Sequence, residues 1–340
     1  MKYTTHFHDR IFVLALVLAV LLSSCFKKED AIPAGEWKGQ AFVFTQSIYD
    51  GEYYYSLAHN EIVNQVSLDS WDISFENGAN GWHIRINSGN LIGITNTGIT
   101  NFDETSFNLK NASWLYDTSN GNPDSTAVGK WVDTTSFPHT YTNNVYLLGK
   151  YNGSSYVPYT KLVFTEVTDT SYTFSYASLD NTNSHTITLK KEGDYNQLYF
   201  SISANKQVTI EPEKQDWDML FTPYYTTLYT DAGVPTPYIV RGVLINPYKV
   251  EVALDTVADF FAIDKSYVAG ENFKTDLDVI GYNWKAVQIN EQANTAVYSV
   301  RANYSFFIKN SSGDVYKLKF MSYTNSIGTD GYPTFIFQKL

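Results

Sequence analysis

A six-residue stretch occurs twice in this chain, first as SWDISF at residues 70–75 and again as DWDMLF at residues 216–221. Four further blocks recur around these copies in the same order. They are YYSLAHNEIV with YFSISANKQV, HIRIN with GVLIN, VGKW with IGYNW, and YLLGKYNGSSYVPYTKLVF with FFIKNSSGDVYKLKF. We interpret this order as a tandem duplication, with a first module at 40–179, a second module at 184–340 and the polar joint ASLDNTNS between them. A repeat of this length is a domain, since propeller blades recur about every 40–45 residues.

The repeated blocks have the pattern of β-strands. Residues 71–75 alternate between apolar and polar side chains, which is typical of a strand buried on one face. Aromatic residues, which favour sheets, make up 16% of the chain. The best helix candidate is 253–263, where apolar side chains recur at helical spacing. The sequence therefore predicts two antiparallel all-β domains with little helix, each able to fold by itself. In each, we expect the WD strand to place its Trp in the core and its Asp on turn backbone groups.

The first residues have the composition of a bacterial lipoprotein signal. Basic residues precede an apolar run that is too short to cross a hydrocarbon core of about 30 Å. The run leads into Leu-Ser-Ser-Cys, where Cys25 is the only cysteine of the chain. These features predict a signal peptide at 1–25, lipid on Cys25 and a flexible tether at 26–39. The Lys-Glu-Asp run in the tether predicts that the anchored protein is exposed on the cell surface, at the outer membrane.

Charge and cysteine content exclude several classes of partner. Removal of residues 1–25 takes away Lys2, Arg10 and Asp9, so the formal net charge of −11 becomes −12. An acidic body of this kind repels nucleic acid. With its only cysteine lipidated, the mature chain can form neither a disulfide nor a cysteine metal site, and we predict no structural metal. The chain has no nucleophile motif, no HExxH and no glycine-rich phosphate loop, so we do not expect an enzyme.

The second copy of the blocks resembles a known family. The run from YFSISANKQV through DWDMLF, GVLIN and GYNWK to the final FIFQKL (199–340) is similar to the HmuY-like family of secreted haem-binding lipoproteins. The first module resembles that family more loosely. The resemblance implies an all-β, lipid-anchored haemophore that binds haem or a related porphyrin and passes it to an outer-membrane receptor. The duplication departs from the best-known members of the family, which have a single module.

The resemblance also implies two axial iron ligands, His or Met, on loops between the IN strand and the last hairpin of the domain. The second module has no His or Met within 247–306, and the first module has none within 88–130. His139 is the one histidine near the expected positions, so it is the candidate haem ligand. We therefore expect haem binding with atypical or missing axial ligands. The alternative is a surface module that binds a glycan or a protein without haem, which suits loops rich in Tyr, Trp, Asn and Gly.

The other potential ligands have simpler interpretations. His59 lies in a turn of a repeated block, while His83 and His185 lie where strands begin. Met219 and Met321 fall in strand blocks, where Met usually fills a core. Tyrosine can also ligate iron. The loop tyrosines are Tyr116, Tyr141, Tyr267 and Tyr282, and none of them stands out among the 27 in the chain.

We predict that the substitution Cys25→Ser releases the protein from the membrane fraction, because the thiol that accepts the lipid is then missing. Fractionation of cells that express the wild type and the variant measures this. Retention of the variant in the membrane fraction would contradict the predicted lipid anchor.

Overall fold

The computed structural model describes residues 37–229, 232–290 and 295–340. Residues 39–340 form one compact unit, which contains all the named strands. The predicted signal peptide, Cys25 and residues 26–36 of the predicted tether lie outside the described residues. No helix in the described part of the chain is long and apolar enough to cross a membrane.

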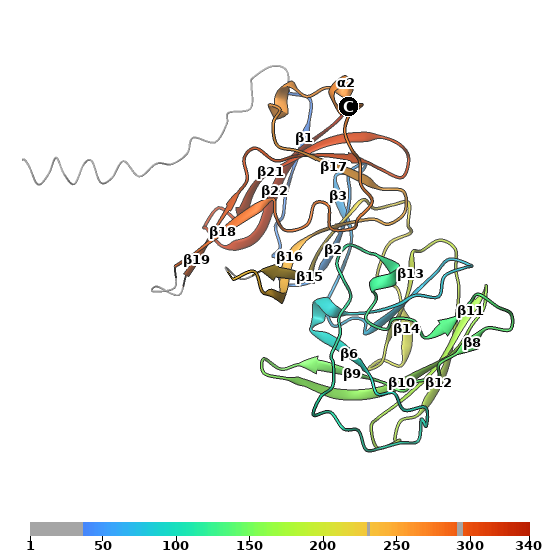
Figure 1. The fold of residues 1–340 in the computed structure, drawn as a ribbon. Coiled ribbons are helices and arrows are strands. Elements are labelled where there is room, and N and C mark those ends of the chain that lie inside the picture. The colour runs from blue at the N-terminus through green and yellow to red at the C-terminus, as the bar shows by residue number, and fades with distance from the viewer. Residues whose placement is uncertain (1–36, 230–231, 291–294) are drawn as a thin grey trace, which may run out of the picture. The chain divides into compact units, whose positions relative to one another are not determined.

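Residues 67–208 form what we call the first lobe, which contains two antiparallel sheets (Figure 1). The five-stranded sheet has the order β12-β11-β10-β9-β6, and the four-stranded sheet has the order β14-β13-β4-β5. Their strands are β4 (Ile73–Glu76), β5 (Ile84–Ile86), β6 (Ile92–Asn96), β9 (Tyr146–Tyr151), β10 (Tyr156–Val167), β11 (Ser171–Ala177), β12 (His185–Lys190), β13 (Gln197–Ser201) and β14 (Lys206–Val208). The lobe also contains a short pair of strands, β7 (Val132–Asp133) with β8 (Thr140–Tyr141), and the 3-10 turns η1 (Ser88–Asn90) and η2 (Pro123–Ser125).

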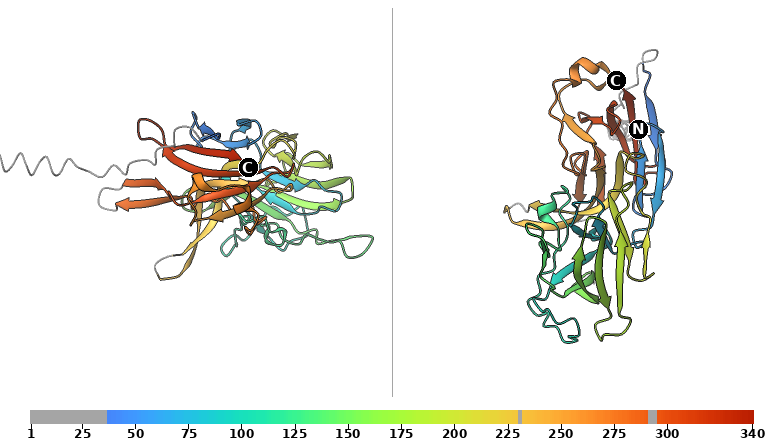
Figure 2. Two further views of the ribbon diagram at one scale, coloured as in Figure 1. Left: turned by 90° about the horizontal axis from the view of Figure 1, so that it is seen from above. Right: turned by 90° about the vertical axis from the view of Figure 1, so that its right-hand side faces the viewer.

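Residues 39–66 and 209–340 form the second lobe. Its sheets have the orders β1-β22-β21-β20-β17 and β16-β15-β2-β3. Their strands are β1 (Gln40–Val43), β2 (Glu52–Ser56), β3 (Glu61–Val66), β15 (Met219–Tyr229), β16 (Pro235–Ile245), β17 (Glu251–Asp255), β20 (Ser305–Lys309), β21 (Val315–Thr324) and β22 (Asp330–Lys339). A two-stranded hairpin, β18 (Lys285–Asn290) with β19 (Thr295–Val300), extends beyond these sheets (Figure 2). The lobe also contains the 3-10 turn η3 (Phe260–Ala262) and one short helix, α2 (Lys265–Val268).

The two lobes contain the same set of sheets, and the repeated blocks occupy matching positions in them. The WD motifs lead into β4 in one lobe and β15 in the other, while Trp131 and Trp284 are each 1% exposed in a core. Two matching lysines are buried as well. Lys161 Nζ donates to Glu104 O at 2.8 Å, and Lys317 Nζ donates to a loop carbonyl at the same distance. The strands pair antiparallel within each sheet, which confirms the predicted all-β fold class.

The strands of each lobe do not follow the boundaries of the two sequence modules. β1 pairs with β22 and β2 pairs with β15, although β1 and β2 precede the first WD motif in the chain. Conversely, β12 and β13 of the second sequence module pair with β11 and β4 of the first. The first lobe is therefore continuous in sequence, whereas residues 39–66 complete the second lobe from the other end of the chain. The module boundaries at 40–179 and 184–340 stay a prediction about the sequence repeat.

The Asp residues of the two WD motifs hold the exchanged hairpins. Asp72 Oδ2 accepts a hydrogen bond from Ile202 N at 2.7 Å, and Asp218 Oδ2 accepts one from Leu57 N at 2.7 Å. Each donor lies in the turn of a hairpin that comes from the other sequence module. Burial raises the pKa of Asp218 to about 6, although the hydrogen bond from Leu57 N favours the charged form. Asp therefore binds turn backbone as the sequence suggested, and it does so between modules.

The helix predicted at 253–263 is wrong. Residues 251–255 form β17, which pairs with β20, and only η3 and α2 follow. The carboxylate of Asp255 accepts hydrogen bonds from Val257 N at 3.0 Å and Ala258 N at 2.9 Å, which ends the strand in a turn. Pairing within the five-stranded sheet thus overrides the helical spacing of the apolar residues.

We predict that the fragment 184–340 does not fold cooperatively by itself, in contrast to what the repeat alone suggested, because residues 39–66 supply part of its core. The side chains concerned, each at most 1% exposed, are Phe44, Ile48, Tyr53, Tyr55 and Leu57. Addition of a peptide of residues 39–66 should restore dispersed amide resonances and a cooperative urea transition. Cooperative unfolding of the fragment without the peptide would show that the second module can close in another way.

Candidate functional site

His139, the candidate haem ligand from the sequence, lies in the turn between β7 and β8 of the first lobe. It is partly exposed, and its Nδ1 lies 2.9 Å from Ser136 O. It lines a cavity of about 210 Å³ together with Trp82, Val167 and their sequence neighbours. No other His and no Met is among the described residues that line this cavity. The cavity thus combines one imidazole with one indole ring.

The other histidines are engaged locally, and none of them lines the cavity of His139, although the ring of His83 lies 3.9 Å from that of Trp82 in its wall. His59 Nδ1 is 3.3 Å from Ser56 Oγ, and His185 Nδ1 is 3.3 Å from an Asn side chain. His83 Nδ1 is 2.6 Å from Glu76 Oε2, and this contact lowers the pKa of Glu76. Across the described residues, no group of three or more His, Cys, Asp or Glu side chains is arranged to hold a metal ion. The structure does not bring a second histidine to His139.

The methionines and loop tyrosines fit structural roles. Met219 is fully buried in the core of the second lobe, and Met321 is half-buried on β21. The ring of Tyr116 stacks on Tyr225 with centroids 4.3 Å apart. The hydroxyl of Tyr141 donates to Val167 O at 3.2 Å. Tyr267 lies in α2 and is 41% exposed, and Tyr282 lies on a loop of the second lobe and is half-buried.

Each lobe has a surface cavity beside the strand that follows its IN block. In the first lobe the cavity measures about 450 Å³ and lies between β6 and the segment 107–115. In the second lobe it measures about 440 Å³ and lies between β17 and the segment 271–279. These cavities fall in the stretches where the HmuY-like resemblance implies the first axial ligand. The described lining residues include no His and no Met in either case, so the ligand shortage seen in the sequence persists in the structure.

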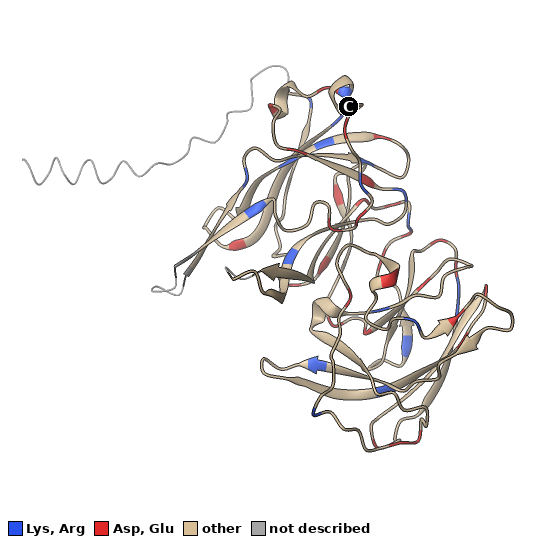
Figure 3. Ribbon diagram, in the orientation of Figure 1, with Lys and Arg blue, Asp and Glu red and all other residues tan. Residues whose placement is uncertain are grey.

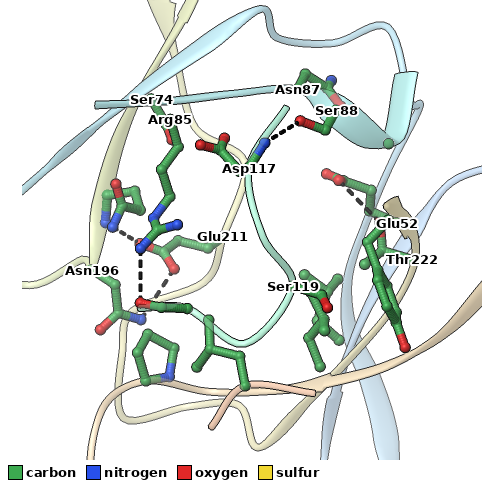
Figure 4. Close-up of a pocket in the computed structure, with 18 of the residues that line it drawn as sticks. Glu52, Ser74, Arg85, Asn87, Ser88, Asp117, Ser119, Asn196, Glu211 and Thr222 are labelled. Carbon is green, nitrogen blue, oxygen red and sulfur yellow. Dashed lines mark hydrogen bonds between the residues drawn. The ribbon is translucent and has the colours of Figure 1, made fainter. Parts of the chain in front are cut away.

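A fourth cavity, of about 180 Å³, lies where the two lobes meet (Figure 4). Its wall comes from β2, β4, β5, η1, the loop 117–121, β13, β15 and β16. In Figure 4 the side chains of Arg85, Asn196 and Glu211 lie on one side of it, and Glu52 lies with Thr222 on the other. The aromatic residues of the wall are Tyr54, Trp71, Tyr199, Trp217, Tyr224 and Tyr225. We call it the interlobe cavity.

Two buried carboxyl groups lie in this wall. Glu52 is 4% exposed, and its Oε2 accepts a hydrogen bond from Trp71 Nε1 at 3.1 Å. Glu211 is 2% exposed, and its Oε1 accepts one from Gln197 N at 2.6 Å. Burial raises the pKa of each of the two carboxyl groups to about 7, against the opposite effect of the hydrogen bonds. Both groups therefore change charge near neutral pH.

An arginine and an aspartate complete the charged part of the wall. Arg85 Nη2 donates to Gly121 O at 2.9 Å. Asp117 accepts hydrogen bonds from Ile86 N at 2.7 Å and Ala127 N at 2.8 Å. Burial raises the pKa of Asp117, and the charge of Arg85 partly offsets this rise. Away from the cavity, Lys and Arg are interspersed with Asp and Glu over both lobes in the coloured part of Figure 3.

Comparison with known proteins bears on the second half of the chain. Residues 194–337 match the family model described as HmuY protein. Residues 194–337 thus form a HmuY-like region of the chain. The match begins just before β13 and ends within β22, so it covers the second sequence module from its first hairpin to its last strand. No curated protein matches the chain.

Three solved structures give weaker likenesses to this chain. Apo PinO from Porphyromonas gingivitis is 11% identical, with 89% of this chain and 98% of that chain covered and a TM-score of 0.27. A putative HmuY-like heme-binding protein from Bacteroides vulgatus is 16% identical, with 53% of this chain and 91% of that chain covered and a TM-score of 0.18. A putative lipoprotein from Bacteroides fragilis is 16% identical, with 56% of this chain and 91% of that chain covered and a TM-score of 0.18. Since all three scores lie below 0.5, the family assignment rests on the family model.

The interlobe cavity escaped the sequence analysis because its residues lie in blocks that the repeat explains as packing. One signal was present. In the matching blocks GEYYYS and NQLYFS, Glu52 of the first module stands opposite Gln197 of the second. A charged residue that faces a neutral one inside matching core blocks indicates a position whose chemical role differs between the two modules.

We predict that the free energy of unfolding of the protein falls as the pH rises from 5 to 8. Glu52 and Glu211 should each contribute on the order of 1–3 kcal/mol to this fall. Their folded-state pKa values of about 7 exceed the usual value of 4.5, so the folded state binds more protons in this window and loses stability as they leave. Urea unfolding at both pH values measures the fall. The variant Glu52→Gln should show a smaller fall, while Glu61→Gln on the exposed face of β3 should behave as the wild type. Identical pH profiles for Glu52→Gln and the wild type would contradict the assignment.

Proposed function

We propose that this HmuY-like protein is a lipid-anchored surface protein that binds haem or a related porphyrin for uptake. The observation that carries the proposal is the match of residues 194–337 to the HmuY family model. The signal Leu-Ser-Ser-Cys at residues 22–25 supports attachment through Cys25, and a receptor in the outer membrane would take over the ligand.

His139 is the side chain that we propose for contact with the iron. It shares its cavity with Trp82, whose flat ring gives a porphyrin a surface to pack on. The cavity of about 210 Å³ is smaller than the roughly 300 Å³ at which pockets for drug-sized ligands begin, so most of a porphyrin would lie outside it. The residues present thus support weak binding through apolar contact with at most one protein ligand to iron.

Recognition of a glycan or of another protein, without haem, is the second candidate function. The observation in its favour is the set of aromatic and polar side chains on exposed hairpins and in the interlobe cavity. Tyr229 and Tyr238 on the β15-β16 hairpin are 71% and 55% exposed. Tyrosines in such positions provide contact area at a low cost in conformational entropy.

We predict a weak, high-spin or mixed-spin haem complex, with similar affinity for iron-free protoporphyrin, because apolar contact rather than two axial ligands holds the ring. Absorbance titration of the whole protein with haem and with protoporphyrin measures both. His139→Ala should shift the Soret band, while His59→Ala, in an exposed turn of the second lobe, serves as the matched control and should leave it in place.

Two outcomes of these titrations would contradict the proposal in different ways. A tight low-spin complex that His139→Ala does not change would show that other residues ligate the iron. No spectral change with either porphyrin would reject porphyrin binding and leave the glycan or protein candidate.

A further inference from the structure

The two WD tryptophans are equivalent in the repeat but differ in hydrogen bonding. Trp71 Nε1 donates to Glu52 Oε2 at 3.1 Å. Trp217 is only 3% exposed, and its Nε1 has no acceptor among the described residues. The residue that matches Glu52 in the second copy is Gln197, and its buried Oε1 also has no donor. Both residues line the interlobe cavity.

An N–H group left without an acceptor in a protein interior costs about 1–3 kcal/mol, and native structures pair nearly all such groups. The first repeat shows the paired arrangement that the WD strand can adopt. In the second repeat, the indole N–H of Trp217 and the amide oxygen of Gln197 pair neither with each other nor with another described residue, so the wall of the same cavity holds one unpaired donor and one unpaired acceptor. Tyr224, whose buried hydroxyl has no partner among the described residues, adds a third such group to the wall. A bound molecule that both donates and accepts hydrogen bonds would satisfy these groups.

The remaining wall restricts the chemistry of such a molecule. Three carboxyl groups, those of Glu52, Asp117 and Glu211, face one guanidinium group, that of Arg85, so the wall disfavours an anion. The guanidinium and the indole N–H of Trp217 are both donors, so a simple ammonium ion, which has no acceptor, leaves them unpaired. Hydroxyl groups donate to carboxylates and accept from N–H groups, and they therefore suit both kinds of partner. The wall fits a neutral, hydroxyl-rich ligand.

Aromatic rings and the size of the cavity point in the same direction. Tyr54 and Trp217 make an edge contact with centroids 5.0 Å apart, as do Trp71 and Tyr199, so the four rings brace one another in the wall. Rings of this kind present apolar faces to the C–H side of a sugar while polar neighbours bind its hydroxyls. At about 180 Å³ the cavity has room for on the order of ten water molecules, which a single sugar ring can replace but a porphyrin cannot.

We propose that the interlobe cavity binds one sugar ring, with Trp217 Nε1 and Arg85 donating to its hydroxyl oxygens and the buried carboxyl groups accepting from its hydroxyl groups. The ring belongs either to a free monosaccharide or to the end of a glycan chain, since the hydrogen-bonding chemistry is the same. This site is separate from the cavity of His139 and does not depend on porphyrin binding.

Titration calorimetry and saturation-transfer NMR on the full mature chain test the proposal. The probes are D-glucose, D-galactose, D-mannose and N-acetyl-D-glucosamine, each as the free sugar and as its methyl glycoside. We expect saturable binding of at least one of them. Binding of the free sugar alone indicates a monosaccharide ligand, whereas equal binding of the glycoside indicates the end of a chain, and both outcomes support the site.

Three variants connect binding to the cavity. Trp217→Phe keeps an aromatic ring but removes the N–H, and it should weaken the sugar by about tenfold, as loss of one hydrogen bond does. Gln197→Glu gives the second repeat the carboxylate that Trp71 binds in the first, and it should also weaken the sugar, because a carboxylate attracts the indole N–H more strongly than an amide oxygen does and competes with the ligand for it. Trp284→Phe is the matched control, because Trp284 Nε1 is likewise buried without an acceptor among the described residues but lies in the core of the second lobe, away from the cavity.

The proposal is overturned if none of the eight probes binds. It is also overturned if the affinity for a bound sugar is the same in the wild type, in Trp217→Phe and in Gln197→Glu, with circular dichroism showing that both variants are folded. These results leave the haem titration untouched, because that experiment reports on the first lobe through the Soret band. Failure of one proposal is therefore distinguishable from failure of the other.

Discussion

The structure depends on two equivalent hydrogen bonds, from Leu57 N to Asp218 and from Ile202 N to Asp72. Each joins the turn of one hairpin to the WD strand of the other half of the chain. A backbone N–H bound to a buried carboxylate is a charge-assisted hydrogen bond, and it fixes the register of the hairpin against the strand. Because the two bonds run in opposite directions along the sequence, each half holds the other. The sheets, the cores and the interlobe cavity all follow from this reciprocal arrangement.

The interlobe cavity illustrates how a repeat can retain its architecture and change one site. The edge contact between a WD tryptophan and a tyrosine of the exchanged hairpin occurs in both copies. The pairing of the indole N–H does not recur: Trp71 Nε1 donates to Glu52, whereas Trp217 Nε1 has no acceptor among the described residues, and Gln197 stands at the position that matches Glu52. Packing and polar pairing are therefore separable in this fold. The aromatic contact recurs within each lobe, whereas the indole N–H is paired in only one of them.

The local sequence pattern was sufficient to predict much of the secondary structure, but it did not predict which strands pair with each other. The alternation at 71–75 correctly predicted a strand, which begins at Ile73, and the recurrence of the blocks correctly indicated that strands fill both halves of the chain. The hairpin exchange could not be predicted, since hairpins as similar as 54–63 and 199–208 fit either WD strand and nothing local distinguishes them. For the same reason the cavity was missed, because it gathers side chains from segments far apart in the chain. The helix expected at 253–263 failed because ladder pairing with β20 outweighs helical spacing.

The closure of the second lobe by residues 39–66 imposes an order on folding during synthesis and export. The first lobe is a single stretch of chain, so it can assemble once residue 208 has emerged. By contrast, β1 emerges before every other strand but pairs with β22, which is the last to emerge. β1 must therefore stay unpaired until the last strand is available. A chain shortened at its C-terminus therefore leaves an apolar segment exposed near its N-terminus. Chaperones and proteases, which bind such segments, would then recognise the incomplete molecules.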